Sequence, residues 1–130
     1  MQQRDTFTVT EPGCGLDSHL WIIVSDPVEY PDQVFGLNVT TWCDGHSDNA
    51  CILDVGDHPW IRRKSCIYYE TPKIFINKQL DLLESKRLLT LHERLTESVF
   101  NRVLQGCMES RHLETGWVDM LVHQGVISYS

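Results

Sequence analysis

The chain has 130 residues, 42% of them hydrophobic, and its formal net charge at pH 7 is −7. This length and apolar content predict one domain with its own core and exclude a disordered chain. No run reaches the roughly 18 to 20 apolar residues of a membrane-spanning helix, and the first ten residues are too polar for a secretion signal. We therefore expect a cytoplasmic protein that makes no membrane contact.

The charge is unevenly distributed along the chain. Residues 1–60 hold one basic and ten acidic residues, for a charge of −9, whereas residues 61–130 hold ten basic and eight acidic residues, for +2. The tightest basic cluster is Arg62-Arg63-Lys64. A net negative charge disfavours general nucleic-acid binding but leaves this local patch available for RNA, with a solvated turn as the alternative interpretation.

The first half of the sequence predicts short strands. Leu20 to Val24 is a continuous apolar run that ends at Ser25-Asp26-Pro27, which indicates a central strand. Further strands are predicted at 34–41, 51–55, 66–69 and 74–76, the last two separated by a turn at Thr71-Pro72. Five or six short strands at close spacing predict a small barrel or sandwich, because a closed sheet has no exposed edges.

The hydrophobic period changes to that of helices after residue 76. A short helix is expected over roughly 78–86, capped by Asn77, and a second follows from apolar residues at every fourth position. The second helix can begin at Thr90, which has capping-box spacing to Glu93, or at Thr96. The apolar positions of this helix are Leu95, Val99, Val103 and Cys107.

These patterns divide a single domain, residues 1–130, into three segments. We expect barrel strands in 15–76, a helical segment in 77–112 and a C-terminal tail in 113–130. The tail contains the apolar stretch Trp117 to Val122, which is expected to dock either on this domain or on a second copy of it.

The cysteines and histidines raise the question of a metal site. Without a signal peptide the five cysteines are expected to be reduced, and Cys51 and Cys66 lie in apolar runs typical of a core. Cys43, His46, Cys51 and His58 offer four zinc ligands within sixteen residues. Their irregular spacing and the apolar surroundings of Cys51 favour packing over metal binding, so no cofactor is expected.

Two histidines are candidates for proton transfer. His58 lies in Gly56-Asp-His-Pro59, where the proline holds it in an extended conformation, and it can serve either as a general acid or base or in a buried polar network. His19 directly precedes the central strand. The motifs of serine hydrolases, nucleotide triphosphatases, dinucleotide-binding enzymes and zinc peptidases are all missing from the sequence, which excludes these classes as leading functions.

Three motifs of the sequence, taken together, point to a known family. They are His19-Leu-Trp-Ile-Ile-Val-Ser25-Asp-Pro27, Leu37-Asn-Val-Thr-Thr41, and Gly56-Asp-His-Pro-Trp-Ile61 followed by Ser65 and Ile67-Tyr68. These motifs resemble the PemK/MazF-like group of bacteria and phages, which are small SH3-like barrels related to plasmid-maintenance toxins. The resemblance covers roughly residues 15–110. It implies a mainly β, SH3-like barrel of five to six strands followed by C-terminal helices.

The resemblance also implies metal-independent cleavage of single-stranded RNA. The threonine that assists cleavage in the toxins corresponds to Thr41, or to Thr40 in the alternative register, while the toxins' arginine has no counterpart and His19 lies in its place. Cleavage needs a proton acceptor, a cation and hydrogen-bond donors. The candidates are His58 or His19 for the proton, Arg62 or Arg63 for the charge, Thr41 and Ser65 as donors, and Arg63, Lys64, Trp60 and Tyr68 for RNA binding.

Two functions of different classes follow from these candidates. The first is a toxin-like endoribonuclease, neutralised by an antitoxin whose acidic tail covers Arg62 to Lys64 and able to form a homodimer through its barrel. The second is a non-catalytic SH3-like module that binds a protein partner, which the −9 charge of residues 1–60 favours over RNA.

Overall fold

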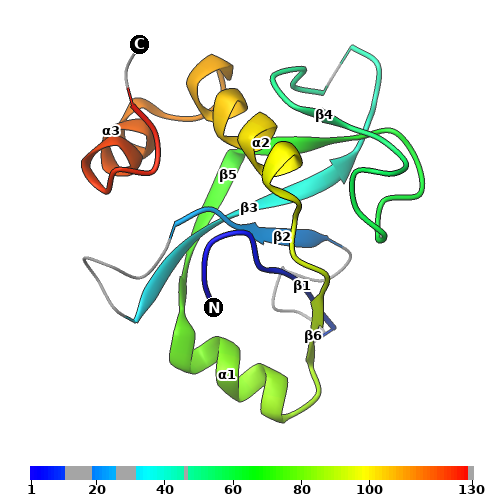
Figure 1. The fold of residues 1–130 in the computed structure, drawn as a ribbon, viewed down its shortest axis with the longest axis vertical. Helices are drawn as coiled ribbons and strands as arrows, with labels where there is room; N and C mark the ends of the chain where they lie inside the picture. The colour runs from blue at the N-terminus through cyan, green and yellow to red at the C-terminus, as the bar shows by residue number, and fades with distance from the viewer. Residues whose placement is uncertain (11–18, 26–31, 46, 129–130) are drawn as a thin grey trace.

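The structure is a computed structural model that describes residues 1–10, 19–25, 32–45 and 47–128. Across these residues it has six antiparallel strands in one curled sheet, ordered β4-β5-β3-β2-β1-β6, and three helices (Figure 1). The predicted mainly β fold with C-terminal helices is confirmed. The elements are β1 (Thr6–Val9), β2 (Leu20–Ile23), β3 (Gln33–Thr41), β4 (Ile52–Leu53), β5 (Ser65–Ile76), α1 (Asn77–Ser85), β6 (Leu89–His92), α2 (Glu97–Glu109) and α3 (Thr115–His123).

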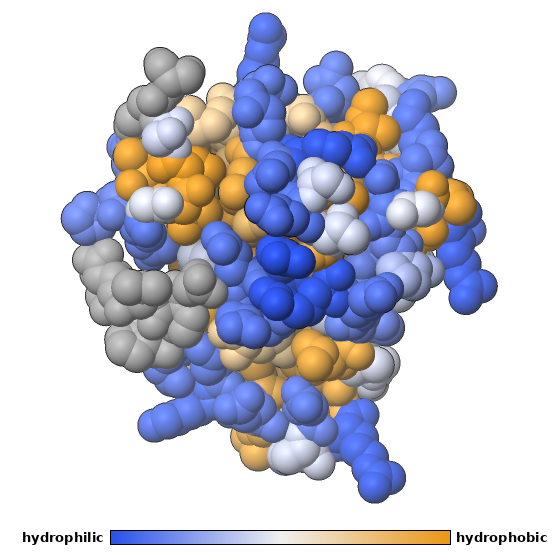
Figure 2. All heavy atoms as spheres, viewed as in Figure 1, coloured by the Kyte–Doolittle hydropathy of each residue, from blue (hydrophilic) through white to orange (hydrophobic). Residues whose placement is uncertain are grey.

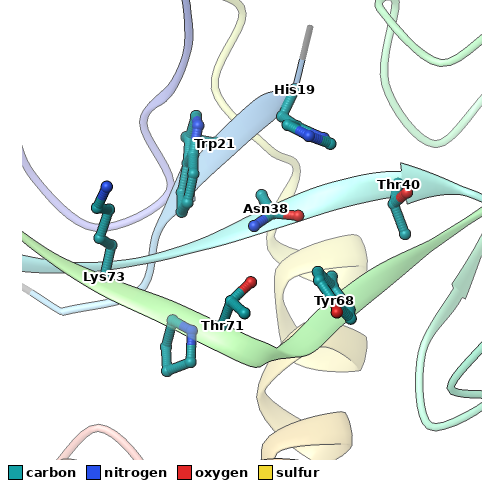
Figure 3. Close-up of a pocket in the computed structure, with 8 residues that line it drawn as sticks. His19, Trp21, Asn38, Thr40, Tyr68, Thr71 and Lys73 are labelled. Carbon is teal, nitrogen blue, oxygen red and sulfur yellow. The ribbon is translucent and has the colours of Figure 1, made fainter. Parts of the chain in front are cut away.

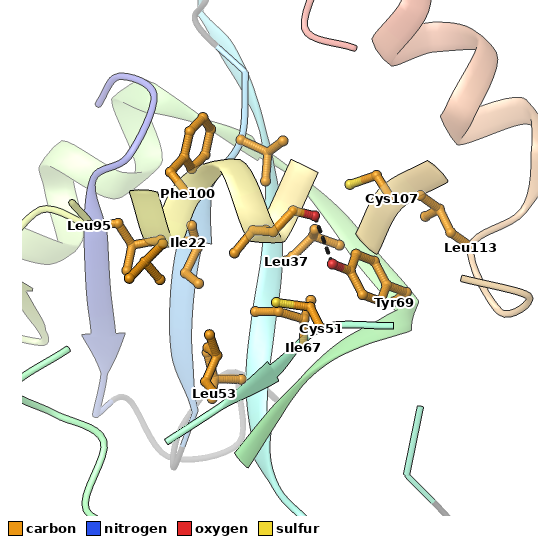
Figure 4. Close-up of a cluster of buried hydrophobic side chains, with 14 of the residues drawn as sticks. Ile22, Leu37, Cys51, Leu53, Ile67, Tyr69, Leu95, Phe100, Cys107 and Leu113 are labelled. Atoms are coloured by element: carbon orange, nitrogen blue, oxygen red, sulfur yellow. Dashed lines mark hydrogen bonds between the residues drawn. The ribbon is translucent and has the colours of Figure 1, made fainter. Parts of the chain in front are cut away.

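The central strand β2 is apolar along its whole length because the sheet is covered on both faces. Ile22 belongs to the larger core, which β2, β3 and β5 form with α2 and α3 (Figure 4). Trp21 and Ile23 point to the opposite face and pack in a smaller core with Phe75 of β5 and Leu80 of α1. Since neighbouring side chains of a strand alternate between faces, burial on both faces requires a continuous apolar run.

Helix α2 begins at the second of its two predicted start sites. The Thr96 side chain caps the helix, with its Oγ1 accepting a hydrogen bond from the Val99 backbone N–H at 3.4 Å. The alternative start at Thr90 is wrong, because Thr90 lies in β6 and pairs with Thr8 of β1. The predicted apolar stripe is buried in the larger core, as expected for a helix that packs on a sheet.

Helix α2 lies so close to β5 that Gly106 leaves no room for a side chain. The Tyr69 hydroxyl donates a hydrogen bond of 2.7 Å to the Val103 carbonyl (Figure 4). A Cβ atom built on Gly106 would overlap the Tyr69 hydroxyl oxygen and lie 3.0 Å from the Cβ of Cys51. The contact between helix and sheet therefore depends on a glycine at this position.

We expect Gly106→Ala to lower the free energy of unfolding, although alanine normally stabilises a helix by about 1 kcal/mol over glycine. The overlap with Tyr69 should outweigh that gain and give a net loss of about 1–3 kcal/mol, as overpacked cores do. Urea unfolding measures this loss. In a Tyr69→Phe background the same substitution should cost less, and a Gly106→Ala protein as stable as the original would contradict the packing described here.

Three local predictions differ from the structure. Thr71 and Pro72 do not separate two strands, since β5 runs unbroken from Ser65 to Ile76 and bulges there instead. Asn77 is the first residue of α1 rather than its cap, which is Ile76 without a side-chain hydrogen bond. Strand β6 interrupts the predicted helical segment 77–112, because Leu89–His92 pairs with β1, which lies ahead of the predicted barrel segment 15–76.

The C-terminal tail docks on this chain's own core. Leu121 of α3 is fully buried, and Phe35 of β3 packs against Trp117 with their ring centroids 5.4 Å apart. Figure 2 shows hydrophilic residues in the middle of the face that carries α2, and hydrophobic residues over α3 and α1. In the part of the chain that the structure describes, no helix has the length and apolar character needed to cross a membrane.

Candidate functional site

A bulge in β5 interrupts the pairing of the two longest strands. Gly36 of β3 pairs with Lys73 of β5, and Asn38 pairs with Tyr68. Between these pairs β3 has a single residue, Leu37, whereas β5 has the four residues 69–72. Bulges of this kind bend a strand and redirect its side chains, and they occur next to active sites more often than elsewhere.

A groove lies over this bulge, on the face of the sheet opposite α2 (Figure 3). We call it the bulge groove. It has a volume of about 340 Å³ and is open to solvent. Its lining comes from strands β2, β3 and β5 and from the residue before β2. Most of these side chains can form hydrogen bonds, and some can exchange protons. The lining residues are His19, Trp21, Asn38, Thr40, Tyr68, Thr71, Pro72 and Lys73.

Asn38 places a buried, unpaired acceptor at this groove. Its side chain is only 4% exposed, and its Oδ1 has no hydrogen-bond partner among the described residues. A buried acceptor without a partner costs about 1–3 kcal/mol. A donor that reached Oδ1 would recover that cost.

The His19 ring lies beside a backbone carbonyl oxygen of β3. The residue is half-buried, and Nδ1 lies 3.4 Å from the Val39 carbonyl oxygen. Because a carbonyl can only accept, Nδ1 is the donor in this contact, and Nε2 is the nitrogen that can accept. This geometry gives His19 the acceptor nitrogen that a general base needs.

Tyr68 and Lys73 add an aromatic surface and a positive charge to the groove. Tyr68 is 36% exposed, and its hydroxyl donates a hydrogen bond of 3.1 Å to Glu70 Oε2. This bond and the charge of Glu70 raise the pKa of Tyr68, so its phenol stays protonated at neutral pH. Lys73 is exposed, and its side chain rises beside Trp21 in Figure 3.

His58 belongs to a buried hydrogen-bond network, and it also borders an open hollow of about 350 Å³ beside the loop that follows β4. Its side chain is 4% exposed. Nδ1 accepts a hydrogen bond of 3.0 Å from the Trp60 N–H, while Nε2 donates to the Glu93 carbonyl at 2.6 Å and lies 3.2 Å from the Thr6 hydroxyl. Both nitrogens are thus occupied by the protein itself. Of the two roles left open for His58, this geometry supports the structural one.

The predicted cationic residues surround a different hollow at the end of the sheet, which we call the basic hollow. It has a volume of about 550 Å³ and is lined by Thr41, Trp60, Ile61, Arg62, Arg63 and Ser65. Both arginines are exposed, whereas Ser65 is buried and its hydroxyl donates to the Arg63 carbonyl at 2.9 Å. Lys64 lies 4.4 Å above the Trp42 ring.

The four residues considered for zinc do not form a site in the described part of the chain. Cys43 is exposed, whereas Cys51 belongs to the larger core, and burial raises the pKa of its thiol to about 11. His46 lies outside the described residues. Among the described residues no three His, Cys, Asp or Glu side chains are grouped as a metal would require.

The structure therefore divides the predicted site residues into three places. His19 and Tyr68 line the bulge groove, His58 lies in the buried network, and the remaining catalytic and RNA-binding candidates lie in or beside the basic hollow. Thr40, the register alternative to Thr41, faces the bulge groove. Sequence reasoning missed Lys73, Trp21 and Asn38, although a polar Asn38 inside an apolar strand was a signal that could have been used.

Comparison with known proteins gives no family assignment. No protein-family model and no curated protein match this chain. Its function therefore has to be inferred from the chemistry of the site, since a fold alone does not determine function.

Proposed function

We propose that this chain is a metal-independent endoribonuclease that acts on single-stranded RNA in the cytoplasm, with its active site in the bulge groove. The observation that carries the proposal is that three residues with suitable chemistry line one open groove. These are His19, Asn38 with its orphaned acceptor, and Lys73 with its ammonium group.

The reaction uses a nucleophile that RNA itself supplies. His19 Nε2 takes the proton from a ribose 2′-hydroxyl, whose oxygen then attacks the adjacent phosphorus. The bond between phosphorus and the 5′-oxygen breaks, and that oxygen takes a proton from the Lys73 ammonium group. The products are a 2′,3′-cyclic phosphate and a free 5′-hydroxyl. Until the bond breaks, the positive charge of Lys73 stabilises the negative charge on the phosphorane oxygens.

The groove also has groups that hold an unpaired base. The exposed ring of Tyr68 offers a face for stacking, which is how proteins commonly bind single-stranded RNA. Asn38 Oδ1 accepts a hydrogen bond from a base N–H group, which satisfies the buried oxygen. The resemblance of the motifs His19 to Pro27 and Leu37 to Thr41 to the PemK/MazF-like toxins supports the same substrate, and an antitoxin remains the proposed partner.

The test is incubation of the purified protein with single-stranded RNA in the presence of EDTA. We expect cleavage that leaves 2′,3′-cyclic phosphate ends, detected by mass spectrometry, and no cleavage of DNA of the same sequence, because DNA lacks the attacking hydroxyl. Intact RNA would reject the proposal, and so would cleavage that leaves 5′-phosphate ends, since those ends require attack by water.

A non-catalytic module that binds a protein partner is the second candidate. The net charge of −7 favours it, because this charge repels the phosphate backbone of RNA outside the cationic regions. In the same assay the module predicts intact RNA at every protein concentration. Cleavage that depends on His19 would exclude it.

A further inference from the structure

The bulge groove does not end at Tyr68 but continues into a second hollow. This middle hollow has a volume of about 330 Å³ and shares Thr40 and Tyr68 with the bulge groove. It also shares Thr41 with the basic hollow. Thr40 and Thr41 are neighbours in β3, so their side chains point to opposite faces of the sheet, and the path from the bulge groove to the basic hollow passes around the end of this strand. Along β3, Gly36, which pairs with Lys73, is five residues or about 17 Å from Thr41.

The charges along this path change sign twice. Lys73 lies at one end, and Arg62 and Arg63 lie at the other. The middle hollow is lined by Asp48 and Glu70, whose carboxylates repel phosphate. Asp48 is fixed in place, because its two oxygens accept hydrogen bonds from the Ala50 N–H and the Ser110 hydroxyl. Phosphate groups are thus favoured at the two ends, while the middle suits a base.

We propose that the basic hollow binds a second backbone phosphate of the RNA whose scissile phosphate lies in the bulge groove. This inference rests on the proposed function and adds a contact outside the reacting groups. Arg62 and Arg63 are exposed and supply guanidinium groups, which match phosphate oxygens with paired N–H donors. Thr41 lines both this hollow and the middle hollow, through which the RNA would pass.

The proposal predicts a dependence on substrate length. A dinucleotide has one backbone phosphate, which the reaction places in the bulge groove, so it has none for the basic hollow. A longer strand has further phosphates and reaches Arg62 and Arg63. Removing these two charges should therefore weaken binding of long RNA far more than binding of a dinucleotide.

The experiment compares Arg62→Gln/Arg63→Gln with the unsubstituted protein and with Lys78→Gln/Lys86→Gln, a control that loses two exposed positive charges near α1. Binding of long RNA is measured by fluorescence anisotropy at several salt concentrations, in a His19→Ala background that prevents cleavage. Each phosphate contact on a single strand contributes about −0.7 to the slope of log K against log salt. We expect the arginine variant to reduce the slope by about 0.7 to 1.4, and the lysine control to leave it unchanged.

The outcomes separate the two proposals. Dinucleotide cleavage with an unchanged salt slope for long RNA would overturn the second phosphate contact and leave the endoribonuclease standing. If the arginine pair instead proved necessary only for binding an acidic peptide such as polyglutamate, the hollow would be a protein-docking site and the phosphate assignment would be wrong. Absence of any RNA cleavage by the unsubstituted protein would reject the proposed function itself.

Discussion

Replacing His19 with alanine is expected to lower the rate of RNA cleavage by about 10²- to 10⁴-fold, the usual contribution of a positioned general base. The variant keeps Tyr68 and Lys73, so RNA should still bind with nearly unchanged affinity. The fold should be little affected, because the residue is only half-buried and its ring contact with the Val39 carbonyl, at 3.4 Å, is long. Single-turnover cleavage at saturating protein measures the loss.

His19→Gln is the matched control for proton transfer. Its amide can donate a hydrogen bond to the Val39 carbonyl but cannot take up a proton at neutral pH. We expect His19→Gln to be as inactive as His19→Ala while its thermal unfolding matches that of the original protein. Cleavage within a few-fold of the original rate in either variant would remove His19 from the mechanism.

Replacing His58 with alanine is expected to lower the free energy of unfolding by about 2–4 kcal/mol, in contrast to the effect at His19. The substitution leaves a cavity under the loop that follows β4 and removes the hydrogen-bond partner of the Trp60 N–H, while the Glu93 carbonyl keeps its 2.7 Å hydrogen bond from the Thr6 hydroxyl. The orphaned N–H costs about 1–3 kcal/mol, and the cavity adds to that loss. Chemical unfolding followed by tryptophan fluorescence measures the change.

His58→Asn separates the two contributions to this loss. An asparagine oxygen lies near the place of the imidazole Nδ1 and can accept from the Trp60 N–H, so we expect a smaller loss of stability than in the alanine variant. At a temperature where His58→Ala remains folded, RNA cleavage should stay within a few-fold of the original rate. A folded His58→Ala protein without cleavage activity would show that His58 acts in the chemistry after all.

Much of the fold could be predicted because its signals are local. The apolar run from Leu20, the four-residue repeat from Leu95 to Cys107 and the Thr96 cap each depend on neighbours within one element. Strands β1 and β6 were not predicted. Both alternate polar and apolar residues, but each is only four residues long, and β1 pairs with β6 more than eighty residues later in the chain as well as with β2. A local period of this length does not reveal a partner so distant in the sequence.

The candidate site was predictable only in part, for the same reason. The sequence identified His19, Tyr68 and Arg62 as reactive, because residue type and neighbouring motifs are enough for that. It could not place Lys73 and His19 in the lining of one groove, since that depends on the register of β3 against β5 and on the bulge between them. The register of a strand pair is set by the packing of both whole strands, and a change of register moves every side chain of the strand to a new position.

The sequence by itself determined a mainly β chain with helices after its strands, and it named the side chains able to do chemistry. Only the tertiary structure decided which histidine meets solvent. Pro59 restricts the backbone of His58, but the ring is enclosed by Thr6 before the first predicted strand and by Glu93 after β6. Whether a side chain is buried depends on which distant segments of the chain pack against it. A histidine's role therefore follows from its tertiary neighbours, and a local motif alone cannot supply it.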